Sequence, residues 1–307
     1  MSDSKNPPGV PGIRVLKAAV FLFLLLGTSL SGLPAQEDDE EEAVFKGIGL
    51  HVRLGGGYSL LSGGDFKTGI QGMYDQSRQL ISSAGFTLGK SNERPLNSGY
   101  ELGGDFVYYF AGRFGIGAGA TLTRVNKINE QLFRLGTILL DHALRIVPRT
   151  DIITLRLGAF YAVPVNRLVT VCLNAGPALY SVDYGCSCSY EMGGYAYQVS
   201  QTVKAKDWGA QGGIGLEIRM NARLAFILET QARYARISGF EGTERLYEHI
   251  GGQSFTSDTT GTLYYVEKEG FPRLEVFSEA PAVGLDGHEA VFDFSGISLR
   301  AGLNFKF

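Results

Sequence analysis

The chain has 307 residues, a formal net charge of −3 and only 19% charged residues, with 42 glycines and 11% aromatic residues. The small negative charge, with no basic helix and no interleaving of basic and aromatic residues, argues against a nucleic-acid-binding protein. Abundant glycine and aromatic residues with few charges are typical of a chain rich in strands and turns.

The first 35 residues have the pattern of an export signal peptide. Positive charges at Lys5, Arg14 and Lys17 precede an apolar core at 18–26, and small residues at 28–35 offer a cleavage site. Residues 36–44 then form an acidic leader, which is expected to be solvated and disordered. Beyond residue 36 no run of 18 apolar residues remains, so the mature chain has to use strands for any membrane crossing.

Eight segments with alternating apolar and polar residues follow. In chain order they span 45–61, 98–111, 114–127, 149–164, 168–182, 205–220, 223–238 and 290–307. Their polar faces are crowded with glycine, which suits the cramped interior of a narrow barrel better than an exposed surface. Residues 45–307 are therefore predicted to form an all-β, eight-stranded antiparallel up-and-down transmembrane barrel, with the polar face inside and the apolar face in lipid.

The inward positions carry charges of both signs in nearly equal number. Because isolated buried charges are unfavourable, these residues are expected to pair with one another inside the barrel. The predicted lumen network consists of His51, Arg53, Glu101, Asp105, Arg156, Glu217, Arg219, Glu229, Arg233 and Arg300. By contrast, the outward faces at 210–220 and 297–307 carry no charge, as expected where lysine or arginine would cost about 2–4 kcal/mol at mid-membrane.

Short and long connections alternate along the chain. Arg113, Arg167 and Arg223 each lie in a very short turn, directly before an apolar strand. The long connections lie near 62–97, 128–148, 183–204 and 239–289, with a short helix expected around 72–82 and a hairpin formed by 263–266 and 274–277. This alternation predicts that the short turns and both termini are periplasmic and that the long loops are extracellular, in a bacterial outer membrane.

The signal segment, the eight alternating strands and a last strand with a terminal aromatic residue resemble the small outer-membrane β-barrels of the OmpA and OmpX type. The resemblance implies that Leu303, Phe305 and Phe307 belong to the assembly signal that the barrel assembly machinery recognises in such families. It covers nearly all of the mature chain and is specific for fold and location, not for activity. The partners it implies are outer-membrane lipid, the assembly machinery during biogenesis, and an extracellular or envelope protein.

Three cysteines remain in the mature chain. Cys186 and Cys188 form a Cys-Ser-Cys segment in the third long loop. Exported compartments favour oxidation, so a disulfide between these two is an alternative to free thiols, although one intervening residue strains the bridge. Two thiols alone make a poor zinc site, and no metal or cofactor is predicted. Cys172 is expected to pack as a small interior residue.

An enzymatic function is the more specific alternative to a non-enzymatic barrel, because acidic and histidine side chains occur together in the predicted loops. An aspartate beside a histidine can orient and activate it, but neighbours on a strand point to opposite faces, so no catalytic residue is assigned. The loop residues considered are Asp65, Asp75, Asp141, His142, His249, Asp258 and His288.

The sequence thus favours a non-enzymatic outer-membrane barrel that presents surface loops for envelope integrity, adhesion or partner binding. A narrow passive porin for small solutes or ions is the second reading, since interior glycines leave some room in the lumen. An outer-membrane protease or lipid-modifying enzyme is the third.

Overall fold

The computed structural model describes residues 49–83, 85, 87–92, 96–126, 129–135, 138–192, 195–281 and 286–307. The predicted signal peptide (1–35) and acidic leader (36–44) lie outside these residues. Among the residues described, no helix is both long enough and apolar enough to cross a membrane.

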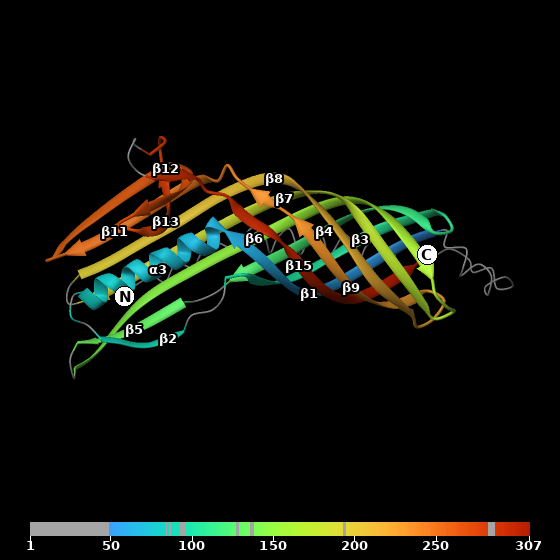
Figure 1. Ribbon diagram of the computed structural model, residues 1–307, viewed down its shortest axis with the longest axis horizontal. Helices are drawn as coiled ribbons and strands as arrows, with labels where there is room; N and C mark the ends of the chain where they lie inside the picture. The colour runs from blue at the N-terminus through green and yellow to red at the C-terminus, as the bar shows by residue number, and fades with distance from the viewer. Residues whose placement is uncertain are drawn as a thin grey trace, which may run out of the picture.

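Eight strands form a closed antiparallel ring (Figure 1). Each strand pairs with the next in chain order, and the last strand pairs with the first, where His51 lies opposite Lys306. The predicted eight-stranded up-and-down barrel is therefore confirmed. The ring strands are β1 (Gly49–Gly64), β3 (Ser98–Ala111), β4 (Phe114–Asn126), β6 (Ile138–Pro164), β7 (Val169–Met192), β8 (Tyr195–Arg219), β9 (Leu224–Tyr234) and β15 (Phe292–Lys306).

At one end of the barrel, three tight turns connect β3 to β4, β6 to β7 and β8 to β9, as the sequence predicts. The Asn166 side-chain oxygen accepts hydrogen bonds from the backbone N–H groups of Leu168 and Val169. Asn221 does the same for Arg223 and Leu224 in the β8–β9 turn. Asparagine suits such turns because its side chain can cap its own backbone. The first residue of β1 and the last residue of β15 lie at this same end, since Phe307 N–H bonds to Leu50 O.

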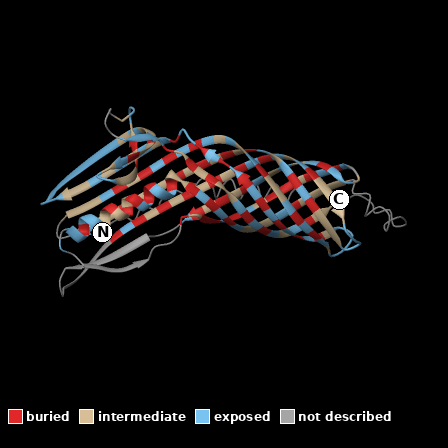
Figure 2. Ribbon diagram, viewed as in Figure 1, coloured by how far each residue is buried: buried red, intermediate tan, exposed pale blue. Residues whose placement is uncertain are grey.

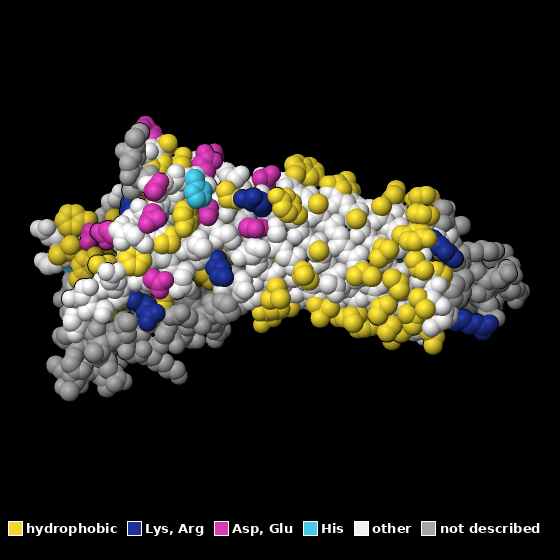
Figure 3. Space-filling model, viewed as in Figure 1, with side chains coloured by type: hydrophobic (Ala, Val, Ile, Leu, Met, Phe, Trp, Pro, Cys, Tyr) yellow, Lys and Arg dark blue, Asp and Glu magenta, His cyan; other side chains and the backbone are white. Residues whose placement is uncertain are grey.

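Partway along the strands, the outward face of the barrel wall changes from apolar to polar and the inward face changes from polar to apolar. On the outward face of β8, Ile214 and Trp208 are 55% and 65% exposed, and the next outward residue is Lys206. On the inward face, the polar Gln211 gives way to the buried Val203. From Ile218 to Trp208 the tilted strand rises roughly 25 Å, the height of the apolar band in membrane barrels. Figure 2 shows the alternation of buried and exposed positions along the strands. Figure 3 shows apolar side chains gathered over the barrel, on the right of the view.

Beyond the exchange, the strands continue into a folded structure that we call the cap (Figure 1). It combines residues 138–151 of β6, 181–192 of β7 and 195–206 of β8 with the elements between the ring strands. Those elements are α3 (Asp65–Ser83), β2 (Thr87–Asn92), β5 (Asn129–Leu135), β10 (Arg236–Ile237), β11 (Glu241–Ile250), β12 (Gln253–Lys268), β13 (Phe271–Phe277) and β14 (Gly287–Glu289).

The cap differs from the predicted loops in two respects. Residues 183–204 were expected to be a loop, but 183–192 and 195–204 continue β7 and β8 as a hairpin. This prediction was wrong because most inward side chains there are apolar and the outward ones polar, the reverse of the pattern used to find the barrel strands. The expected hairpin at 263–277 is confirmed as β12 and β13, joined at Glu269, which has a φ of 56°. The helix in the first loop is confirmed too, and begins earlier than predicted, at Asp65.

Helix α3 lies against β13 and covers the inner side of the cap sheet. Its apolar stripe includes Phe66, Ile70 and Tyr74, each at most 2% exposed. The helix approaches β13 closely because Gly69 and Gly72 face it: a Cβ atom on Gly72 would overlap the backbone oxygen of Pro272. The helix is thus fixed in place by packing, with Gln76 also donating to Glu269 at 3.2 Å.

Replacing Gly72 by valine is expected to loosen α3 from the cap. The added side chain meets backbone that cannot move aside easily, so we expect a cost of about 1–3 kcal/mol in docking of the helix. Hydrogen exchange of the α3 amides should accelerate while the barrel amides stay protected. The Gln71→Val variant is the matched control, because Gln71 is exposed on the same helix. Equal exchange in both variants would show that the glycine contact is unimportant.

Candidate functional site

The barrel lumen is filled by buried charged side chains that pair with one another. Asp105 receives two hydrogen bonds from the Arg156 guanidinium, at 2.8 and 2.5 Å. Glu101 lies 3.1 Å from Arg233 and 3.3 Å from Arg300. All five side chains are at most 9% exposed. Charged groups buried to this extent are stable only when opposite charges and hydrogen bonds compensate for lost water.

Toward the short-turn end, a second group of charges surrounds Glu217. Arg53 lies 3.8 Å from its carboxylate, Lys306 forms an ion pair with it, and Asn304 donates to it at 2.7 Å. His51 Nδ1 lies 3.2 Å from Asn304 Nδ2. The His51 ring also packs against Tyr109, with centroids 4.7 Å apart.

Neutral polar side chains that were not predicted as lumen residues also belong to the network. Asn174 accepts from Arg156 at 3.1 Å and donates to Glu229 at 2.5 Å. Ser59 bridges Glu101 and Arg233 with two bonds of 2.5 Å. Both residues occupy inward positions of the alternating pattern, Asn174 on β7 and Ser59 on β1, and this position could have identified them. They were missed because the lumen residues were predicted from charge alone.

Nine of the ten predicted lumen residues lie in this interior, and Arg219 does not join them. Its half-exposed side chain lies at the short-turn mouth, where Nε donates to the backbone oxygen of Asn221 at 3.4 Å. The glycines opposite the charges provide the space for long side chains. A Cβ on Gly119, for example, would overlap the Asp105 carboxylate.

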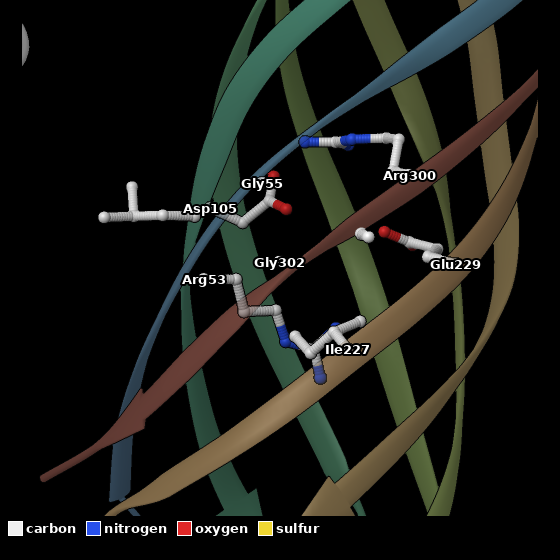
Figure 4. A pocket seen from close by; sticks show the side chains of 9 residues that line it. Arg53, Gly55, Asp105, Ile227, Glu229, Arg300 and Gly302 are labelled. Atoms are coloured by element: carbon white, nitrogen blue, oxygen red, sulfur yellow. The ribbon is translucent and has the colours of Figure 1, made fainter.

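Little free space remains inside the barrel. A cavity of about 20 Å³ lies among Arg53, Asp105, Glu229 and Arg300 (Figure 4). A cavity needs a volume of about 10–15 Å³ to hold one water molecule, so this cavity has room for about one water molecule. The lumen at this level is a packed interior.

Above the ion pairs, the inward face becomes aromatic and closes the mouth toward the cap. Tyr184 on β7 and Phe292 on β15 are fully buried, with ring centroids 5.2 Å apart. Phe66 of α3 packs on both, at 5.8 and 5.4 Å. The helix therefore covers the barrel from the cap side, and the lumen is bounded by charge pairs below and an apolar core above.

The cysteines are free and buried. The disulfide considered between Cys186 and Cys188 is not formed, because residues two apart on an extended strand are roughly 6–7 Å apart, too far for a disulfide. Cys172 packs inside the barrel as predicted, where Arg53 donates to its sulfur at 3.3 Å. Among the described residues, no three His, Cys, Asp or Glu side chains are grouped to hold a metal ion.

The cap thiols are expected to resist alkylation in the folded protein. Burial raises the pKa of Cys186 to about 12 and that of Cys188 to about 11. Since the thiolate is the reactive form, neither thiol ionises appreciably at pH 8 and reaction with maleimide should be negligible. Counting of labelled thiols by mass spectrometry should give three only after denaturation without reductant. Two unreactive cysteines after denaturation would reveal a disulfide.

The acidic and histidine residues of the predicted loops are separated into several places. His288 Nε2 and Asp65 Oδ2 lie 2.9 Å apart, and the same oxygen accepts from Val291 N–H. His249 Nδ1 lies 2.9 Å from Ser254 Oγ at the exposed β11–β12 tip.

Neither pair is a complete catalytic triad. Among the described residues, no serine, threonine or cysteine hydrogen-bonds to His288, and no carboxylate hydrogen-bonds to His249. Asp75 and Asp258 bond to Gln71 and Arg245 respectively. The side chains of Asp141 and His142 lie outside the described residues.

The last strand closes the barrel on both edges, with β1 on one side and β9 on the other. Leu303, Phe305 and Phe307 share its outward face, and Leu303 and Phe307 are 38% and 51% exposed. Their recognition by the assembly machinery stays a prediction.

No protein-family model matches the chain, and no curated protein is significantly similar to it in sequence. The solved structures to which the chain is similar include three outer-membrane proteins. OprG from Pseudomonas aeruginosa is 12% identical, covers 86% of this chain and 99% of its own, and has a TM-score of 0.39. Ail of Yersinia pestis is 10% identical, with 85% and 99% covered and a TM-score of 0.33.

The third is the outer-membrane protease OmpT from Escherichia coli, which is 10% identical, with 85% and 97% covered and a TM-score of 0.32. The closed strand ring and the apolar exterior band of this chain identify its fold by themselves. The chain has the fold of the small outer-membrane β-barrels.

Proposed function

We propose that this protein is a closed, non-enzymatic outer-membrane barrel that presents its cap to a protein partner outside the cell. The observation that carries the proposal is the filled lumen: paired charges occupy it, and α3 with the aromatic core covers it. A barrel of eight strands leaves an interior just wide enough for side chains. What distinguishes this barrel is a folded cap with its own buried core.

The proposed orientation places the cap at the cell surface and the three short turns in the periplasm. Outer-membrane barrels generally have short periplasmic turns and longer extracellular connections, and the even strand number puts both barrel ends on the periplasmic side. Cleavage by an added protease at the β11–β12 tip, which is exposed at Phe255, tests this in whole cells. Cleavage should occur without permeabilising the outer membrane. Cleavage only after permeabilisation would reverse the orientation.

Conductance in a planar bilayer tests whether the barrel is closed. The purified full chain should give no reproducible ion steps, because the charge pairs and α3 block the passage. Insertion has to be verified in the same preparation, by strand-type circular dichroism and by protection of the barrel from protease. Reproducible steps from correctly inserted protein would instead support the narrow porin.

The proposal also holds that Asp65 and His288 fasten the start of α3 to the strand end near Val291. The purified protein is then expected to hydrolyse neither peptides nor lipids. Hydrolysis that disappears in the His288→Ala variant, with hydrogen exchange of α3 unchanged, would support the outer-membrane enzyme.

A further inference from the structure

The short-turn end of the barrel carries positive charge that no other part of the described chain neutralises. One arginine lies in each tight turn, Arg113, Arg167 and Arg223, and all three are exposed. Arg219, at the end of β8, is half-exposed beside them. We call these four residues the basic rim. Figure 3 shows dark-blue side chains at this end.

The basic rim has no acidic partner among the described residues. None of its four arginines forms an ion pair with a described carboxylate, and the turns contain no aspartate or glutamate. Glu217, the nearest acidic side chain in sequence, is 4% exposed and faces the lumen, where it binds Arg53 and Lys306.

The opposite rim, at the cap side of the apolar band, is different. There Arg124 and Arg149 share Asp151, at 2.6 and 2.8 Å. Lys204 lies 3.1 Å from Asp183. Arg124, Arg149 and Lys204 are thus paired within the protein, whereas Lys206 and Arg236 at that boundary, like all four arginines of the basic rim, form no ion pair with a described carboxylate.

The exposed apolar residues next to the basic rim determine the depth of its arginines in the membrane. Arg113 precedes Phe114 and Arg167 precedes Leu168, whose side chains are 56% and 62% exposed on the lipid-facing surface. Met220, 62% exposed, follows Arg219. In a membrane these apolar side chains enter the acyl region, so each guanidinium lies at headgroup depth, where anionic lipids attract basic residues.

We propose that the basic rim binds the phosphate groups of anionic phospholipids in the leaflet on the short-turn side. Arginine suits this role because its planar guanidinium donates two parallel hydrogen bonds to phosphate oxygens. Four such groups around one mouth would hold that end of the barrel at a fixed depth. The inference requires only that the barrel spans a membrane, and it is independent of conductance and of the partner of the cap.

The test measures the preference of spin-labelled phosphatidylglycerol over spin-labelled phosphatidylcholine for the reconstituted full chain. We expect the wild type to prefer the anionic lipid by about two- to fivefold at low salt. The R113Q/R167Q/R219Q/R223Q variant should lose this preference. The K204Q/K206Q/R236Q variant, altered at the cap-side rim, should keep it. Should the quadruple variant fail to fold, R167Q alone should reduce the preference.

Two outcomes would overturn the proposal. One is an equal lipid preference in the wild type and the basic-rim variant. The other is no preference in the wild type, followed by a gain when the acidic residues 37–42 are changed to their amides. That result would assign the basic rim to the acidic leader of the same chain.

Discussion

Replacing Glu101 by alanine is expected to lower the free energy of unfolding by about 3–5 kcal/mol, the usual cost of removing one partner from a buried charge pair. Glu101 is 5% exposed and accepts from both Arg233 and Ser59, with Arg300 at 3.3 Å. Its loss leaves two buried arginines without their carboxylate, at a place where water has little room.

The measurement is denaturant unfolding of the chain from lipid vesicles. The single tryptophan, Trp208, is 65% exposed near the membrane boundary and reports transfer out of the bilayer by its fluorescence. The Asp183→Ala variant is the control, because its pair with Lys204 is largely exposed and contributes at most about 1 kcal/mol. A loss for Glu101→Ala no larger than for Asp183→Ala would show that the lumen pairs are dispensable.

Changing Ile214 to arginine should cost about 2–4 kcal/mol, if the outward face of β8 lies in acyl chains at that depth. Ile214 is 55% exposed within the apolar band, so a new charge there meets lipid without any internal partner. Unfolding from vesicles measures the loss, and the yield of folded barrel should fall with it.

Thr202→Arg is the matched variant, on the same strand and the same outward face but in the cap. Thr202 is exposed beyond Lys204 and Lys206, where the surface meets water. Its change should stay within about 0.5 kcal/mol, as for ordinary surface substitutions. A similar loss of unfolding free energy in both variants would show that the membrane boundary lies elsewhere. No loss in either variant would show that the outward face of β8 does not contact lipid.

The alternation of side chains was sufficient to find the ring strands. A strand has a period of two, so apolar and polar faces can be read directly wherever the two sides meet different media. That reading located β3 and β4 within a residue of their ends and placed Arg53, Glu101 and Arg300 inside. It failed at 183–204, where most inward residues are apolar and the outward residues polar, the reverse of the membrane-spanning part of the barrel.

The cap could not be obtained from the sequence, because its core joins segments far apart in the chain. Phe66, Tyr184 and Phe292 meet only after the barrel has brought β1, β7 and β15 together. The partner choice of each charge is likewise a matter of register: Glu101 could in principle pair with any inward arginine, and the strand stagger selects Arg233 and Arg300.

By itself, then, the sequence determined the strand number, the lipid-facing side and the filling of the lumen, because these depend on local periodicity and side-chain size. Tertiary structure alone decided the exclusion of Arg219 from the lumen pairs, the covering of the mouth by α3, and which charged residues pair with one another. The physical reason is that pairing and packing depend on distances across the barrel, which exist only once the ring has closed.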